Sequence, residues 1–119
     1  MKRILLCLMV ALFATGCLFA KNNDEKMNVM SYNIRYDNLG DKDNQWKFRR
    51  DFAADLVKFY EADVFGAQEV LNNQLNDLLN RLPEYAYVGV GREDGKTKGE
   101  YAPIFYRKDR FSVDKSGNF

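Results

Sequence analysis

The feature that most constrains the fold is a pair of short apolar segments, residues 27–34 and 63–69, on either side of a segment with helical periodicity. The second apolar segment shows no alternation with polar side chains, which is typical of a strand buried on both faces. A strand, a helix and a second strand in this order predict a right-handed crossover connection. The sequence therefore predicts two parallel strands in an α/β sheet.

Two segments have the three- and four-residue spacing of apolar side chains that predicts a helix. In residues 71–82 leucine recurs at this spacing until Pro83, which cannot continue a helix. In residues 46–60 the apolar side chains at this spacing are Phe48, Phe52, Leu56 and Phe59 on one side, with Ala53, Val57 and Tyr60 beside them. We therefore assign Trp46, Phe48 and Phe52 to core packing rather than to stacking on nucleic-acid bases.

Two further segments, residues 85–90 and 101–107, have the composition of strands and are joined by a loop rich in glycine and lysine. Such a hairpin would turn the parallel pair into a mixed sheet, and residues 111–114 are expected to begin another strand. The strand around Ile104 is apolar or aromatic on both faces, although two helices can cover only one. Because soluble monomers rarely leave a large apolar face bare, we expect a partner or a longer domain to supply another layer.

The first twenty residues have the pattern of an export signal, in which two basic residues precede an uncharged apolar run over residues 4–13. The run is too short to span a bilayer comfortably, which favours a cleaved signal over an anchor. Cys17 follows three small residues and resembles the lipobox cysteine of bacterial lipoproteins, so cleavage before Cys17 and cleavage after Ala20 both stay open. The expected location is periplasmic, extracellular or attached to a bacterial membrane through a lipid on Cys17.

Composition excludes several kinds of site. Both cysteines, Cys7 and Cys17, lie in the predicted signal, so residues 21–119 form one domain with neither a disulfide nor a cysteine nucleophile. The formal net charge is only +1, whereas proteins that wrap duplex DNA usually carry a basic excess. The chain contains no histidine, the commonest general base.

Polar side chains end the two predicted parallel strands, with Asn33 at the first and Glu69 at the second. The carboxyl ends of parallel strands meet at one edge of the sheet, where open α/β sheets bind ligands. A carboxylate oxygen there suits Mg²⁺, and an uncharged amide can orient a phosphate oxygen. The alternative is a loop-entry asparagine and a surface carboxylate stabilised by a helix dipole.

Several motifs of the chain together resemble the endonuclease/exonuclease/phosphatase superfamily, most closely its exported, bacterial, metal-dependent hydrolases. In chain order they are Met30-Ser31-Tyr32-Asn33-Ile34-Arg35, Trp46 with Arg49 and Arg50, Asp63-Val64-Phe65-Gly66-Ala67-Gln68-Glu69-Val70, Gly99-Glu100-Tyr101-Ala102-Pro103-Ile104-Phe105-Tyr106-Arg107, and Arg110-Phe111. The resemblance spans residues 27–119, and it is more specific for the motifs in this order than for each motif alone.

This resemblance implies a DNase I-like, four-layer α/β/β/α sandwich, of which the chain would form the N-terminal half with a mixed sheet. It also implies that Asn33 positions the scissile phosphate and that Glu69 is a ligand of Mg²⁺ or Mn²⁺ in the hydrolysis of a phosphate ester. Glu100 and Tyr101 are secondary site candidates. The substrate class stays open between a small molecule, a lipid head group and a nucleic acid.

The resemblance further implies that several catalytic elements are absent from these residues. A histidine base, an Asp-x-Asn pair and a terminal Ser-Asp-His-like element lie later in members of the family. We therefore expect residues 21–119 to be the N-terminal part of a truncated domain, inactive alone, whose partner is the missing C-terminal half. The alternative is a non-catalytic exported or lipid-anchored module that binds a partner through its exposed sheet face.

Overall fold

The computed structural model describes residues 26–118, so the predicted signal over residues 1–20, including Cys17, lies outside the described residues. In chain order the elements are β1 (Val29–Asn33), the 3-10 helix η1 (Leu39–Asn44), α1 (Trp46–Phe59), β2 (Val64–Gln68), α2 (Asn72–Arg81), β3 (Tyr85–Val88) and β4 (Ile104–Arg107). Within residues 26–118, no helix is both long enough and apolar enough to cross a membrane.

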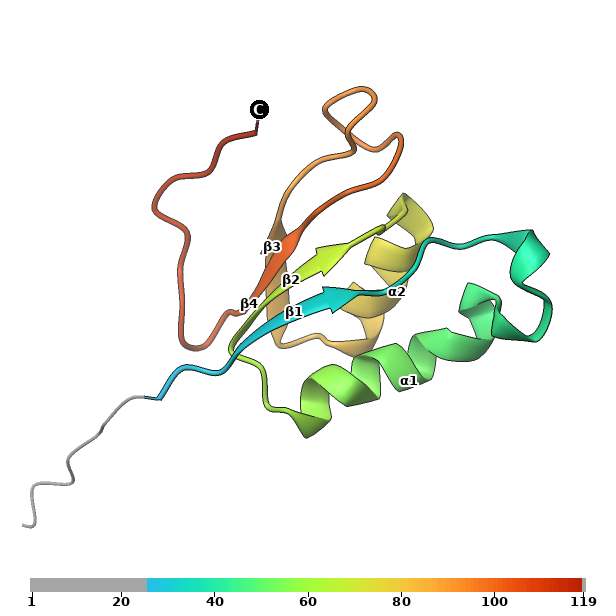
Figure 1. Ribbon diagram of the computed structural model, residues 1–119. Coiled ribbons are helices and arrows are strands. Elements are labelled where there is room, and N and C mark those ends of the chain that lie inside the picture. The colour runs from blue at the N-terminus through green and yellow to red at the C-terminus, as the bar shows by residue number, and fades with distance from the viewer. Residues whose placement is uncertain (1–25, 119) are drawn as a thin grey trace, which may run out of the picture.

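The four strands form one mixed sheet in the order β1-β2-β4-β3 (Figure 1). β1 and β2 are parallel, and their register places Asn33 opposite Gln68, the residue before Glu69. β4 runs antiparallel to both β2 and β3. The predicted crossover unit and the predicted mixed sheet are therefore confirmed, and the two polar strand ends lie at the same edge.

Both helices lie on one side of the sheet (Figure 1), and the core lies between the helices and the sheet. Phe65 of β2 stacks on Phe105 of β4 with ring centroids 4.5 Å apart, and Tyr85 meets Phe65 edge-on at 5.5 Å. Leu75 and Leu78 of α2 close this cluster from the helical side. The leucine periodicity of residues 71–82 was thus a correct guide to the buried face of α2.

The predicted apolar side of α1 is correct for Trp46, Ala53 and Val57 but wrong for the phenylalanines. Phe48, Phe52 and Phe59 are 62%, 67% and 77% exposed, and the residues that α1 buries are Trp46, Ala53, Ala54 and Val57. Polar contacts between the helices fix this rotation: Trp46 Nε1 donates to Asp77 Oδ2 of α2 at 2.8 Å, and Arg81 Nε binds Asp51 Oδ1 at 2.5 Å. The apolar pattern of α1 offered two faces, and contacts with α2 select the one with small side chains.

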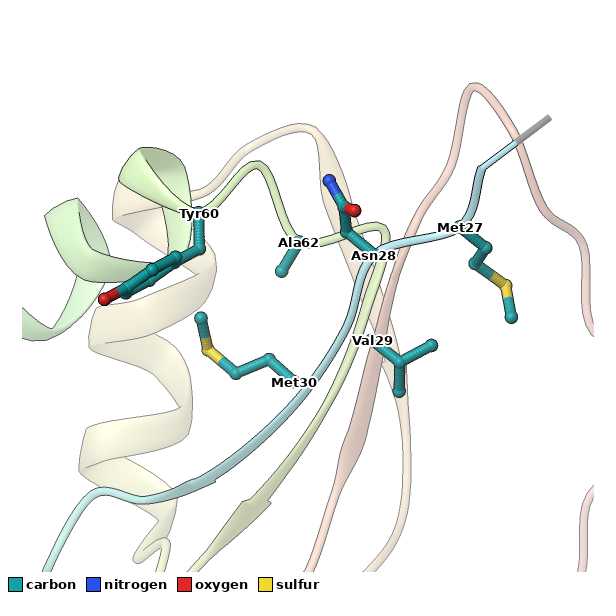
Figure 2. A pocket seen from close by; sticks show the side chains of 6 residues that line it. All are labelled: Met27, Asn28, Val29, Met30, Tyr60 and Ala62. Carbon is teal, nitrogen blue, oxygen red and sulfur yellow. The ribbon is translucent and has the colours of Figure 1, made fainter. Parts of the chain in front are cut away.

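No helix or strand among residues 26–118 covers the other side of the sheet (Figure 1), although residues 115–118 line a pocket there with Ile104. Val29 and Ile104 are 65% and 49% exposed there, as expected from strands that are apolar on both faces. The alternation along β1 is visible in Figure 2, where Met30 points toward Tyr60 and Ala62 while Val29 points to the opposite side. The strand predicted at residues 111–114 does not form, and these residues are irregular and largely exposed.

Candidate metal and phosphate site

The two polar strand ends contact each other directly. Asn33 Nδ2 donates a hydrogen bond to Glu69 Oε1 at 2.8 Å, and the backbone N–H of Tyr36 donates to Glu69 Oε2 at 3.2 Å. Asn33 Oδ1 in turn accepts from the backbone N–H of Arg35 at 2.8 Å. Each oxygen of the Glu69 carboxylate therefore has one protein donor, and each oxygen keeps lone pairs free for another ligand.

The backbone shortly after each strand is in the left-handed region, with φ of 59° at Glu69, directly after β2, and 57° at Arg35, two residues after β1. A side chain other than glycine in this region is uncommon and costs roughly 1–3 kcal/mol, which the surrounding structure must offset. At Glu69 this conformation ends β2 and turns the chain into α2, so that the carboxylate faces the end of β1. Such outliers concentrate at functional sites.

The two donors also affect the charge of Glu69. The Asn33 amide, and then the Tyr36 N–H, lower the pKa of the Glu69 carboxyl below its ordinary value, and their effect exceeds the opposing effect of burial. Hydrogen bonds that are made to the charged form stabilise that form. Glu69 is therefore ionised at neutral pH, which a hard divalent cation requires of an oxygen ligand.

Arginine side chains hold the loop that follows β1. The guanidinium of Arg35 makes a bidentate pair with Asp41, with both N–O distances 2.6 Å, and this pair lowers the pKa of Asp41. Arg49 of α1 donates to the carbonyl oxygens of Ile34 at 2.7 Å and of Asn44 at 2.5 Å. The sequence gives no signal for the role of Arg49, because its partners are main-chain carbonyl groups, which every residue carries.

The secondary candidates Glu100 and Tyr101 line a groove together with Glu69. The groove has a volume of about 540 Å³, and its lining includes Gln68 and Arg92. Tyr101 is buried, pairs through its backbone with Val70, and donates its hydroxyl to Asn72 Oδ1 at 3.1 Å. Glu100 is 3.3 Å from Arg92. Tyr101 thus supports the segment after Glu69, whereas Glu100 is engaged in an ion pair.

The candidate site offers Mg²⁺ or Mn²⁺ one carboxylate ligand, that of Glu69. Among residues 26–118, no group of three or more histidine, cysteine, aspartate or glutamate side chains could hold a metal ion. Mg²⁺, however, usually binds through one or two carboxylates and keeps several waters. The ionised, oriented carboxylate of Glu69 meets this requirement, and Glu69 is the residue that would hold the ion.

Comparison with known proteins agrees with the fold, although no protein-family model matches the chain. The chain is similar to an endonuclease/exonuclease/phosphatase of Bacteroides vulgatus, with 54% identity and a TM-score of 0.70 over 71% of this chain and 33% of that one. It is also similar to the mannosyl-6-phosphatase of Bacteroides thetaiotaomicron, with 42% identity and a TM-score of 0.76 over 77% of this chain and 35% of that one.

A curated relative is the 3'-5'-exoribonuclease subunit Ccr4 of the CCR4-Not complex of Mycosarcoma maydis. It is 28% identical over 108 residues, which are 75% of this chain and 16% of that protein. The chain thus spans 33% to 35% of the two solved structures and a smaller share of the curated relative.

Fold and sequence together define an α/β protein with a phosphoesterase-type fold. The motifs predicted this similarity to proteins of the endonuclease/exonuclease/phosphatase family, and the comparisons confirm it over about a third of the solved relatives' length.

Proposed function

We propose that the chain carries the Asn33–Glu69 part of a divalent-metal-dependent phosphoesterase site. The observation that carries this proposal is the 2.8 Å hydrogen bond between these side chains at the carboxyl edge of two parallel strands. One hydrogen of the Asn33 amide group is used in this bond, which leaves the second available to a phosphate oxygen. Asn33 can therefore orient the ligand carboxylate and a bound phosphate at the same time.

Glu69 would hold Mg²⁺ or Mn²⁺, which when bound neutralises charge on the phosphoryl oxygens. The chain's own contribution is to keep the carboxylate ionised, through Asn33 and the Tyr36 N–H. The 119 residues contain no histidine, so a histidine that activates water has to come from outside them. We therefore expect these residues alone to bind the cation but to hydrolyse phosphate esters very slowly.

The test is Mn²⁺ binding to the full chain, measured from paramagnetic broadening of the Asn33 side-chain amide signal. Glu69→Gln should abolish the specific broadening, because the amide carries no charge for the cation. Glu84→Gln, at an exposed glutamate before β3, should leave it unchanged. Equal broadening in both variants would contradict the proposal.

Hydrolysis is measured in parallel on mannose 6-phosphate and on an oligoribonucleotide, because relatives of the chain are named as a mannosyl-6-phosphatase and an exoribonuclease. Robust turnover that Glu69→Gln abolishes would show that a histidine base is not needed.

Export, inferred from residues 1–20, is tested by the N-terminus of the processed protein. Cys17 as the first residue would indicate cleavage as a lipoprotein, and Lys21 would indicate cleavage after Ala20.

The exposed face of the sheet supports a second candidate function, that of a non-catalytic module. Val29 and Ile104 are exposed on that face, so a partner could bind there, either the rest of a longer domain or another protein. The nucleotide sequence beyond the codon for Phe119 separates these cases. A continuing frame with Asp-x-Asn and histidine elements favours the enzyme.

A further inference from the structure

Gln74 is a polar side chain with no exposed surface, in the first turn of α2. Its Oε1 accepts hydrogen bonds from the backbone N–H groups of Leu71 and Asp37, each at 3.0 Å. Its Nε2 donates to the carbonyl oxygen of Arg35 at 2.9 Å. Because an unpaired polar group is costly in a buried position, these three bonds strongly favour one arrangement of the main chain around Gln74.

The three partners belong to the two segments that carry the candidate site. Leu71 lies two residues beyond Glu69. Arg35 and Asp37 lie in the loop after β1, on either side of Tyr36. The N–H of Tyr36 is the donor to Glu69 Oε2. Gln74 therefore holds the main chain before and after the amide that orients the candidate metal ligand.

A purely local role for Gln74 explains only part of this arrangement. Glutamine at the third position of a helix commonly caps the N–H that precedes the helix, and the bond to Leu71 does this. The other two bonds reach residues 37 and 39 positions away in the sequence. They hold a loop that contains the left-handed backbone of Arg35, a conformation that needs such external support.

We infer that Gln74 is a positioning residue for Glu69, acting through the main chain of Tyr36. The inference rests on the proposed role of Glu69 as a metal ligand. Without Gln74, the Glu69 side chain still projects from the end of β2, but the Tyr36 N–H is no longer held beside it. The carboxylate then samples more orientations, and the cation binds more weakly.

Two substitutions of Gln74 in the full chain test this inference, with Mn²⁺ as the probe. Gln74→Met keeps the length of the side chain and removes all three hydrogen bonds. Gln74→Glu keeps an acceptor for the two N–H groups but loses the donor to the Arg35 carbonyl. We expect Gln74→Met to raise the Kd for Mn²⁺ by about 10- to 100-fold, the range found for residues that orient metal ligands, and Gln74→Glu to raise it less.

The matched control is Leu78→Ala, one turn further along the same buried face of α2. Leu78 has no polar side-chain atom with which to hold the loop after β1. This variant loses packing stability, yet at a temperature where every variant is folded it should bind Mn²⁺ as the unaltered chain does. If Leu78→Ala weakens Mn²⁺ binding as much as Gln74→Met, the effect is general destabilisation and the inference fails.

Hydrogen exchange gives a readout that does not depend on the metal. The amides of Tyr36 and Asp37 should exchange faster in Gln74→Met, while those of β2 and β4 keep their protection. Unchanged exchange at Tyr36 overturns the inference, even if the unaltered chain binds no Mn²⁺ and the proposed function itself fails. If Gln74→Met does not fold, the same two measurements are made on Gln74→Glu. Unaltered amide exchange at Tyr36 together with an unaltered Kd for Mn²⁺ would then overturn the inference.

Discussion

At the scale of single residues, the candidate site consists of one carboxylate whose two oxygens are each held by a donor. Glu69 accepts from Asn33 and from Tyr36, and its left-handed backbone turns it toward β1. The hydrogen bonds do more than fix geometry, because they also keep the carboxylate charged as the pH falls. Asn33 is thus tied to the chemistry of the site through the pKa of its neighbour.

Replacing Asn33 should therefore change how Glu69 titrates. Asn33→Ala removes the largest cause of the lowered pKa, so the pKa of Glu69 should rise toward its ordinary value and Mn²⁺ binding should be lost at a higher pH. The measurement is a pH titration of the Glu69 Cδ signal by NMR. Asn73→Ala is the control, because the Asn73 amide binds Asp37 instead; an equal rise there would refute the role of Asn33.

The same shift predicts a direction for stability. A pKa that is lower in the folded than in the unfolded state contributes stability above the ordinary pKa of glutamate, and this contribution is lost as the pH falls through the folded value. In Asn33→Ala the loss is smaller, because less of the shift is left to lose. Thermal unfolding at neutral and at acidic pH would show a weaker acid dependence in this variant than in the unaltered chain.

At the scale of the elements, the sequence predicted most positions but not the rotation of α1. Strands and helices follow short-range patterns, and the crossover rule brings Asn33 and Glu69 to one edge without further information. The buried face of α1 depends instead on partners in α2, such as Asp77 for Trp46. The bonds of Gln74 to Asp37 and Arg35 likewise join residues distant in the sequence. Only its bond to Leu71 follows a local pattern, that of a glutamine in the first turn of a helix.

The rotation of α1 predicts unequal effects on stability for two substitutions that the apolar pattern alone would rank together. Val57→Ala opens space in the core, where Val57 has no exposed surface, and should lower the free energy of unfolding by about 2 kcal/mol. Phe52→Ala removes a larger side chain that is 67% exposed, and should change it by about 0.5 kcal/mol or less. Urea unfolding of both variants measures the difference, and a larger loss in Phe52→Ala would contradict the structure.

At the scale of the whole molecule, the described residues form a sheet with helices on one side and an apolar face on the other. The solved relatives share this fold over a third of their own length, so the second side is where a further layer would pack. An uncovered apolar sheet face promotes association between molecules. The candidate metal site and this face meet at Ile104, which is exposed and lines the groove beside Glu69, whereas Val29 does not line that groove.

Charging the uncovered face should therefore change association without affecting the site. We expect Val29→Lys to shift the chain toward monomer in sedimentation velocity, because a lysine side chain opposes apolar contact between sheet faces. Mn²⁺ binding should stay as in the unaltered chain, because Val29 does not line the groove beside Glu69. Phe59→Lys on the outer side of α1 is the matched control, since it adds the same charge at an exposed apolar position away from the sheet. If the control variant disperses the chain equally, α1 rather than the sheet face drives association. If the unaltered chain is a cooperatively folded monomer, the sheet face needs no second layer, and the independent module becomes the better proposal.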